Sequence, residues 1–253
     1  MASIVPSKKI MSKLGKTNAE FELIEEGDKV LVGLSGGKDS LTMIHAMKEQ
    51  LRRAPFKFEF LAVTVGYGMG ENFDELVKHC KEYDIPHIVH DTNTYELAKE
   101  KIRKNSSFCS FFSRMRRGYL YSVALENGCN KVALGHHMDD AAESFFMNFI
   151  YNGQMRSLAP KYKAENGLIV IRPLIQMRER QLQAFVEDNG INAIGDEACP
   201  AMRFDVKMPH ARAKMKEMLA KMEVEFPSLF TSLNASFKNI SQDSFFDKEK
   251  FSL

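Results

Sequence analysis

Residues 34–40 have the composition of a phosphate-binding turn. Their sequence, Leu-Ser-Gly-Gly-Lys-Asp-Ser, follows the apolar residues 29–33, which predict a buried strand, and precedes a helix expected to open at Leu41. A glycine turn at such a point gathers backbone N–H groups around an anion, and the start of the helix adds a partial positive charge. Two adjacent glycines let the backbone approach a phosphate without obstruction by Cβ atoms. The candidate binding residues are Ser35, Gly36, Gly37, Lys38, Asp39 and Ser40.

Two familiar nucleotide-binding motifs are absent from the sequence. The P-loop needs a glycine where Val32 stands and a serine or threonine where Asp39 follows the lysine. No Gly-x-Gly-x-x-Gly segment occurs either. The alternative for residues 34–40 is an ordinary solvated turn between a strand and a helix.

A second polar segment, residues 135–140, follows the strand predicted at residues 131–134. It contains Gly135, His136, His137, Asp139 and Asp140. Its imidazoles and carboxylates could coordinate Mg²⁺ or contact phosphates, and Asp139 could cap the helix that follows. The alternative is a polar strand end with an ordinary helix cap. Because ligands of open α/β sheets bind beyond the C-terminal ends of the strands, we expect this segment to meet residues 34–40.

Strand-like and helical segments alternate along the chain, which predicts an α/β fold with a parallel twisted sheet and helices on both faces. Strands are expected at residues 29–34, 58–65, 86–90, 131–134 and 167–171, and helices at residues 41–52, 73–80, 113–126, 141–151 and 178–189. Beyond about residue 200 the sequence becomes helical and basic.

Composition and charge narrow the class of protein. The 253 residues are 44% hydrophobic, enough for one large core, and the net charge is only +2. Seven basic residues against one acidic residue lie between positions 99 and 117, which indicates a local site for an anionic partner. Four scattered cysteines exclude a disulfide framework, and Cys80 and Cys129 fall on apolar patterns typical of the core. With no signal peptide or membrane-spanning stretch visible, we expect a cytoplasmic protein that does not contact a membrane.

The two polar segments together are similar to those of the PP-loop ATP pyrophosphatases, and further stretches resemble one family among them. These are residues 108–118 (Phe-Cys-Ser-Phe-Phe-Ser-Arg-Met-Arg-Arg-Gly), 171–174 (Ile-Arg-Pro-Leu), 178–179 (Arg-Glu) and the tail at 243–247. They resemble the tRNA 2-thiocytidine synthetase (TtcA) family over nearly the whole chain. The resemblance implies an adenine nucleotide alpha hydrolase-like fold. It places a PP-loop ATP pyrophosphatase domain at residues 27–200, an N-terminal helical extension at 1–26 and a helical C-terminal appendage at 201–253.

This resemblance implies an ATP-dependent tRNA sulfurtransferase. Such an enzyme cleaves ATP between its α and β phosphates and adenylates the 2-oxygen of a cytidine at position 32, in the tRNA anticodon loop. Sulfur then replaces that oxygen. The implied cofactors are ATP, Mg²⁺ and a 4Fe-4S cluster. The implied partners are tRNA and a sulfur donor, either a cysteine desulfurase or a persulfide carrier, and homodimers are common in the family.

The resemblance also assigns roles to individual residues. The implied ATP-binding residues are Ser35, Gly36, Gly37, Lys38, Asp39, Ser40, Gly135, His136, His137 and Asp140. The implied Mg²⁺ ligands are Asp39, Asp139 and Asp140, and the implied catalytic residues are Lys38, Asp39, Cys109 and Cys199. Arg114, Arg116 and Arg117 would contact tRNA beside aromatic rings that can stack on a base, and the basic face of the C-terminal helices could lie along it. The alternative for residues 113–121 is a packed helix whose arginines are solvated.

The cysteines depart from the family's pattern, in which three thiolates hold the cluster. Cys109 and Cys199 match two of the three positions, but Phe112 stands at the remaining one and cannot bind iron. Three interpretations stay open: a cluster with an unidentified further ligand, a persulfide route that uses the two cysteines directly, or a loss of sulfur transfer. The alternative functions are a lysidine synthetase-like ligase and a nucleotide-dependent RNA-binding protein without catalysis.

Overall fold

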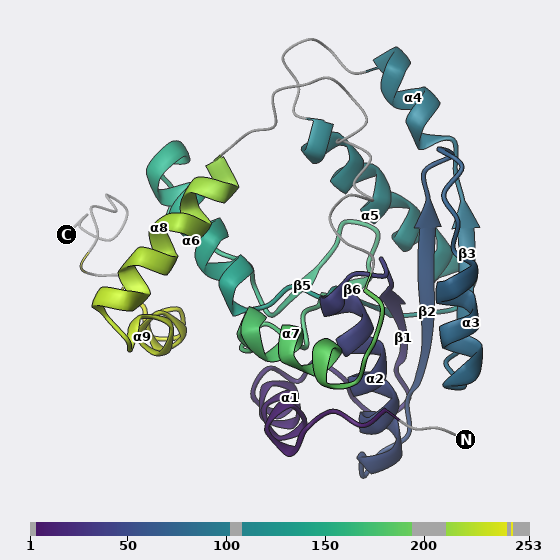
Figure 1. The fold of residues 1–253 in the computed structure, drawn as a ribbon, viewed down its shortest axis with the longest axis horizontal. Helices are drawn as coiled ribbons and strands as arrows, with labels where there is room; N and C mark the ends of the chain where they lie inside the picture. Colours follow the sequence, from purple (N-terminus) through teal and green to yellow (C-terminus); the bar gives the residue numbers. More distant parts are fainter. Residues whose placement is uncertain (1–3, 102–107, 194–210, 242–243, 245–253) are drawn as a thin grey trace, which may run out of the picture.

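The computed structural model describes residues 4–101, 108–193, 211–241 and 244. Within these residues, six strands form one sheet in the order β3-β2-β1-β4-β6-β5 (Figure 1). The strands are β1 (Lys29–Gly33), β2 (Glu59–Gly66), β3 (His87–Asp91), β4 (Lys131–Ala133), β5 (Lys161–Lys163) and β6 (Ile169–Ile171). The helices are α1 (Lys8–Phe21), α2 (Lys38–Arg53), α3 (Asp74–Glu82), α4 (Thr94–Lys101), α5 (Phe108–Glu126), α6 (Met138–Asn152), α7 (Glu179–Asp188), α8 (Ala211–Glu225) and α9 (Leu229–Ser236).

The pairings in this sheet are parallel except for that of β5 with β6. β1 lies between β2 and β4, with Val32 opposite Ala62 on one side and Ala133 on the other. The predicted α/β fold with a parallel sheet is therefore confirmed, with one antiparallel strand at the edge. The sequence pattern predicts neither β5 nor α4. β5 is Lys-Tyr-Lys and α4 is rich in charged residues, so neither element shows an apolar run or an apolar repeat.

Alternation along β1 divides the core into two layers. Val32 is buried in a cluster with Leu14 of α1 and Ile44 of α2, whereas Leu31 is buried in another cluster with Leu120 of α5. Successive side chains of a strand point to opposite faces of the sheet. Helices α1, α2 and α7 thus cover one face and α5 the other, which confirms the prediction of helices on both faces.

The C-terminal helices α8 and α9 pack on α6 (Figure 1). Met138, Leu219 and Phe230 are buried together in a small cluster of their own at this contact. The division of the chain at residues 26 and 200 stays a prediction. Among the helices of the described residues, none combines the length and the apolar character needed to cross a membrane.

Cys80 and Cys129 are both buried, one in each layer of the core. Burial raises the pKa of the Cys80 thiol to about 11, so this thiol stays protonated at neutral pH. The prediction that these two cysteines pack in the core is confirmed.

A buried ion pair joins β4 to the segment before β1. The side chain of Lys131 is 4% exposed, and its ammonium group lies 2.7 Å from a carboxylate oxygen of Asp28. It also donates hydrogen bonds to the backbone carbonyl of Leu23 and to Glu25, both at 3.0 Å. Asp28 accepts a further hydrogen bond from Asn130 at 2.7 Å. Both charges are removed from water but well partnered, so loss of either partner is costly.

We expect Lys131→Ala to lower the free energy of unfolding by about 3–5 kcal/mol, because it leaves the buried Asp28 carboxylate without its partner. Lys29→Ala is the matched control, since Lys29 begins the neighbouring strand and pairs with Glu59 at 3.8 Å on the surface. An exposed pair contributes at most about 1 kcal/mol. Urea denaturation measures both losses, and equal losses would contradict this account of Lys131.

Two histidines form a contact between α2 and α3. The Nε2 atoms of His45 and His79 are 2.9 Å apart. His45 is 2% exposed, and its ring packs against Tyr83 and Phe185. Burial, together with the charges of His79 and Lys48, lowers the pKa of His45 to about 3. His45 is therefore neutral in the folded protein at pH values where a histidine of the unfolded chain is protonated.

This difference predicts a loss of stability in weak acid. Below about pH 6.5 the unfolded chain binds a proton at His45 that the folded protein excludes, so this residue lowers stability by about 1.4 kcal/mol per pH unit. The free energy of unfolding of His45→Gln should therefore vary less between about pH 6.5 and pH 5 than that of the wild type. Denaturant titrations across this pH range give the two slopes. Identical slopes would show that His45 does not exclude a proton.

Candidate functional site

The predicted phosphate turn leads from β1 directly into α2. The helix begins at Lys38, before the predicted start at Leu41, so that Lys38 and Asp39 lie in its first turn. Gly36 has a φ of 82°, a left-handed conformation that glycine adopts without steric cost. Gly37 is the N-cap and has no side chain that could accept hydrogen bonds from the first-turn N–H groups. These groups and the helix dipole therefore favour an anion at this point.

Serine hydroxyl groups close the turn. Ser40 Oγ donates a hydrogen bond to the carbonyl of Gly37 at 2.9 Å and accepts one from the N–H of Ser35 at 3.2 Å. The hydroxyls of Ser35 and Ser40 are 3.2 Å apart. Ser40 is buried, whereas Ser35 is exposed. Ser40 thus shapes the turn from within, and Ser35 lies where a ligand could reach it.

The second predicted segment meets this turn. Gly135 lies against the start of α2, where a Cβ atom on this residue would be 3.5 Å from the backbone nitrogen of Ser40. His137 is the N-cap of α6 and forms a capping box with Asp140, whose carboxylate accepts a hydrogen bond from the His137 N–H at 2.9 Å. His137 Nε2 lies 3.8 Å from Asp39 Oδ1. The prediction that the two segments share one edge of the sheet is confirmed.

Asp139 does not cap α6, because His137 takes that position; the prediction of an Asp139 cap is wrong. The carboxylate of Asp139 reaches α7 instead, where it accepts hydrogen bonds from Arg178 Nε at 3.1 Å and from the N–H of Glu179 at 2.7 Å. Burial raises the pKa of Asp139, but its bonds with His137, Arg178 and Glu179 outweigh burial and lower the pKa well below its usual range. Asp139 is thus an ionised link between α6 and α7.

The two adjacent histidines differ in protonation. Burial and the charge of Arg172 lower the pKa of His136 to about 4, and its Nδ1 accepts a hydrogen bond from Arg172 at 3.3 Å. Burial would also lower the pKa of His137, but the three surrounding aspartates outweigh it and raise this pKa above the ordinary value. At neutral pH, His136 is therefore uncharged, whereas His137 carries more positive charge than an ordinary histidine.

Asp39 is the carboxylate best placed to ligate a cation. Its Oδ1 atom is buried without a hydrogen-bond partner, and burial together with the charges of Asp140 and Glu179 raises the pKa of its carboxyl group. Asp139 and Asp140 are less suitable, because their oxygens already accept hydrogen bonds from neighbouring residues. Across the described ranges, no group of three metal-ligating side chains surrounds one point. A Mg²⁺ ion held by one carboxylate and by phosphate oxygens of a nucleotide fits this arrangement.

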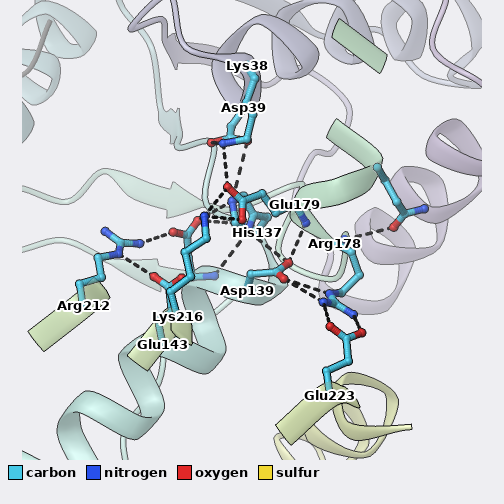
Figure 2. Close-up of polar contacts among 12 residues, drawn as sticks. Lys38, Asp39, His137, Asp139, Glu143, Arg178, Glu179, Arg212, Lys216 and Glu223 are labelled. Carbon is cyan, nitrogen blue, oxygen red and sulfur yellow. Dashed lines mark hydrogen bonds and ion pairs between the residues drawn. The ribbon is translucent and has the colours of Figure 1, made fainter. Parts of the chain in front are cut away.

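A network of ion pairs brings α8 to the site (Figure 2). Lys38 Nζ is 3.0 Å from one carboxylate oxygen of Glu179, and Lys216 Nζ is 2.8 Å from the other. Arg212, one turn earlier on α8, pairs with two carboxylates of α6. Four helices therefore contribute charged side chains to one place: α2, α6, α7 and α8.

These contacts were not predicted from the sequence, where residues 178–179 enter only as the start of a predicted helix and as part of the family resemblance. A signal was present, because Arg212 and Lys216 are four residues apart and so share one face of a helix. The local pattern does not say, however, which acidic residues that face meets.

Arg178 fastens the C-terminal helices to the site. Its guanidinium donates two hydrogen bonds to Glu223 of α8, at 2.6 and 2.8 Å, and lies 3.3 Å from the centre of the Phe230 ring of α9. The same group donates to Asp139 of α6. Only the planar guanidinium can combine a bidentate pair with stacking on a ring in this way.

The residues implied in sulfur chemistry are only partly described. Cys199 lies outside the described residues, and Cys109 lies on α5 but its side chain is not among the described ones. Phe112 is 3% exposed and packs edge-on against Tyr67, with 5.7 Å between the ring centres. A buried phenyl ring offers no ligand atom to iron, so the described residues do not fit the family's three-thiolate cluster site.

The three arginines implied in tRNA contact lie on α5. Arg114 is exposed, and Arg116 and Arg117 are half-buried. Arg116 is close enough to His136 for its charge to contribute to the lowered pKa of that histidine. The basic part of α5 therefore lies near the two segments at the sheet edge.

We expect Arg178→Gln to loosen α8 and α9, because Glu223 and Asp139 would lose a partly buried charged partner. The expected loss is about 2–4 kcal/mol in the free energy of unfolding, with faster amide hydrogen exchange in residues 211–241. Arg180→Gln is the matched control, since Arg180 is 72% exposed and lies 3.5 Å from the same Glu223. If the two variants exchanged at the same rate, the role given to Arg178 would be wrong.

Comparison with known proteins gives the family. The profile of the PP-loop domain matches residues 6–209. Two relatives named tRNA-cytidine(32) 2-sulfurtransferase come from Geobacter metallireducens and Syntrophotalea carbinolica. The first is 39% identical over 245 residues, which are 96% of this chain and 93% of the relative. The second is 41% identical over 235 residues, which are 92% of this chain and 89% of the relative.

A solved structure supports the same fold. The U34-tRNA thiolase NcsA from Methanococcus maripaludis, with its 4Fe-4S cluster, matches 92% of this chain and 77% of its own with a TM-score of 0.73. At 24% sequence identity, this likeness concerns the fold alone. From the domain match and from both relatives, the chain belongs to the tRNA-cytidine(32) 2-sulfurtransferase family of PP-loop proteins.

Proposed function

We propose that this chain is an ATP-dependent tRNA sulfurtransferase that replaces the 2-oxygen of the cytidine at position 32 with sulfur. The observation that carries the proposal is the turn into α2, with its glycine N-cap and with Lys38 and Asp39 in the first turn, in a chain of this family. Both relatives are named for this reaction.

The first half of the reaction would use the two segments at the sheet edge. The 2-oxygen of the cytidine attacks the α-phosphorus of ATP and pyrophosphate leaves, which turns a poor leaving group into AMP. The first-turn N–H groups, Lys38 and Ser35 would stabilise the departing pyrophosphate, and one well-placed donor of this kind contributes about 3–4 kcal/mol. Asp39 would hold Mg²⁺, which adds positive charge at the phosphate oxygens when bound.

The second half would use Cys109 and Cys199. A persulfide on one cysteine attacks carbon 2 of the base, and AMP leaves with the oxygen. The other cysteine then attacks the enzyme's sulfur of the mixed disulfide, which releases the thiolated base and leaves a disulfide for a cellular thiol to reduce. Phe112 supplies no ligand atom, so no step is assigned to a cluster.

The partners follow from this chemistry. We place the phosphates of the anticodon loop against Arg114, Arg116 and Arg117 of α5. This helix lies near the site, because the charge of Arg116 contributes to the lowered pKa of His136. The sulfur would come from a cysteine desulfurase or a persulfide carrier. We expect the protein to work in the cytoplasm, as a homodimer.

Mass spectrometry of tRNA nucleosides tests the proposal. We expect 2-thiocytidine to be lost from host cells that lack the gene and to return with the wild-type protein. Lys38→Ala should not restore it, because one lost phosphate contact slows the reaction by about 100-fold or more. Cys109→Ser and Cys199→Ser should fail as well, because neither leaves a complete sulfur relay.

Cys129→Ala is the matched control for the cysteine variants, because Cys129 is buried in the core and should be dispensable. Restoration by Cys109→Ser or Cys199→Ser would overturn the persulfide route. Unchanged 2-thiocytidine in every strain would overturn the sulfurtransferase proposal and favour the ligase or the RNA-binding alternative.

A further inference from the structure

The carboxylate of Glu179 lies between two lysines that come from opposite ends of the chain. Lys38 Nζ, on α2, is 3.0 Å from Glu179 Oε1. Lys216 Nζ, on α8, is 3.0 Å from the same oxygen and 2.8 Å from Oε2. Figure 2 shows the three side chains pointing toward one another beside Asp39 and His137. One negative group thus holds two positive groups together at the start of α2.

The pair of Lys216 with Glu179 is weak enough to exchange partners. The side chains of Lys38 and Glu179 are about a quarter exposed, and that of Lys216 is 61% exposed. An ion pair with so exposed a lysine contributes little to stability. The position of α8 does not depend on Lys216, because Arg178 and the apolar cluster around Phe230 already fasten the C-terminal helices. Lys216 can therefore change its partner while α8 stays in place.

A phosphate group suits the place of this carboxylate. It carries more negative charge than a carboxylate and offers three oxygens to both lysines. It would also lie near the first-turn N–H groups of α2, which Gly37 leaves without a side-chain cap. Arg212 is less suited to this exchange, because it is paired with Asp140 and Glu143 together.

We propose that Lys216 is a second phosphate-binding cation, and that Glu179 is an internal counter-ion which the phosphates of ATP displace from Lys38 and Lys216. The inference rests on the proposed function, from which it takes ATP as the anion. It gives helix α8 a part in nucleotide binding. Asp39, 3.5 Å from Lys38, remains in place to face the cation that accompanies the nucleotide.

Substitutions of Lys216 and of Glu179 should change the affinity for phosphates in opposite directions. Isothermal titration calorimetry of the full chain with MgATP and with magnesium pyrophosphate measures this affinity. We expect Lys216→Gln to weaken binding about 10-fold, the effect of one lost charged contact. Glu179→Gln should strengthen binding about threefold or more, because the phosphates no longer compete with a carboxylate for the two lysines. Lys216→Arg keeps the charge and should stay within about threefold of the wild type.

Lys221→Gln and Glu217→Gln are the matched controls. They remove the same kinds of charge from an exposed pair on α8, the helix of Lys216, with 2.6 Å between Lys221 Nζ and Glu217 Oε1. Both variants should leave affinity within about twofold of the wild type. Thermal unfolding without ligand checks that each variant is folded.

Three results would contradict different parts of the proposal. Weaker binding in Glu179→Gln would make this residue a support for Lys38 and overturn the counter-ion role. Unchanged affinity in Lys216→Gln would overturn the second cation. A wild-type protein that binds neither ligand would overturn the proposed function itself, a result distinct from both.

Discussion

The hydrogen-bonded pairing of β1 with β4 is the constraint on which the candidate site depends. The two strands are parallel and Val32 lies opposite Ala133, so the chain leaves both strands side by side at one edge of the sheet. The turn into α2 and the cap of α6 begin there, and this brings His137 within 3.8 Å of Asp39. Val32 and Ala133 are completely buried, so a shift in register would cost apolar burial as well as hydrogen bonds.

Three aspartates can share this edge because they differ in their partners. The ionised Asp139 accepts hydrogen bonds from Arg178 and from the N–H of Glu179 at the start of α7. Asp140 accepts hydrogen bonds from the cap of α6 and from Arg212. Asp39 keeps one buried oxygen without a hydrogen-bond partner, and burial raises the pKa of its carboxyl group. The unequal pairing leaves one carboxylate at the start of α2 for which an added cation would be favourable.

Local patterns predicted the elements well where the pattern was long or chemically distinctive. The alternation of strands and helices predicted the parallel α/β sheet, and the glycine turn predicted a helix directly after it, although this helix begins at Lys38 and not at Leu41. The same reasoning failed for β5 and α4, whose polar sequences show neither an apolar run nor an apolar repeat. It also gave the cap of α6 to Asp139, because histidine is an uncommon N-cap and aspartate a preferred one.

The sequence by itself determined the fold class, the family and the two segments that meet at the sheet edge. Each of these depends on residues close together in the chain, or on strand order that parallel pairing requires. Only the tertiary structure decided the partners of those segments: Glu179 between Lys38 and Lys216, and Arg178 between Asp139 and Glu223. The physical reason is that charge pairing acts through space, and a helix pattern does not specify which distant helix its charged face will meet.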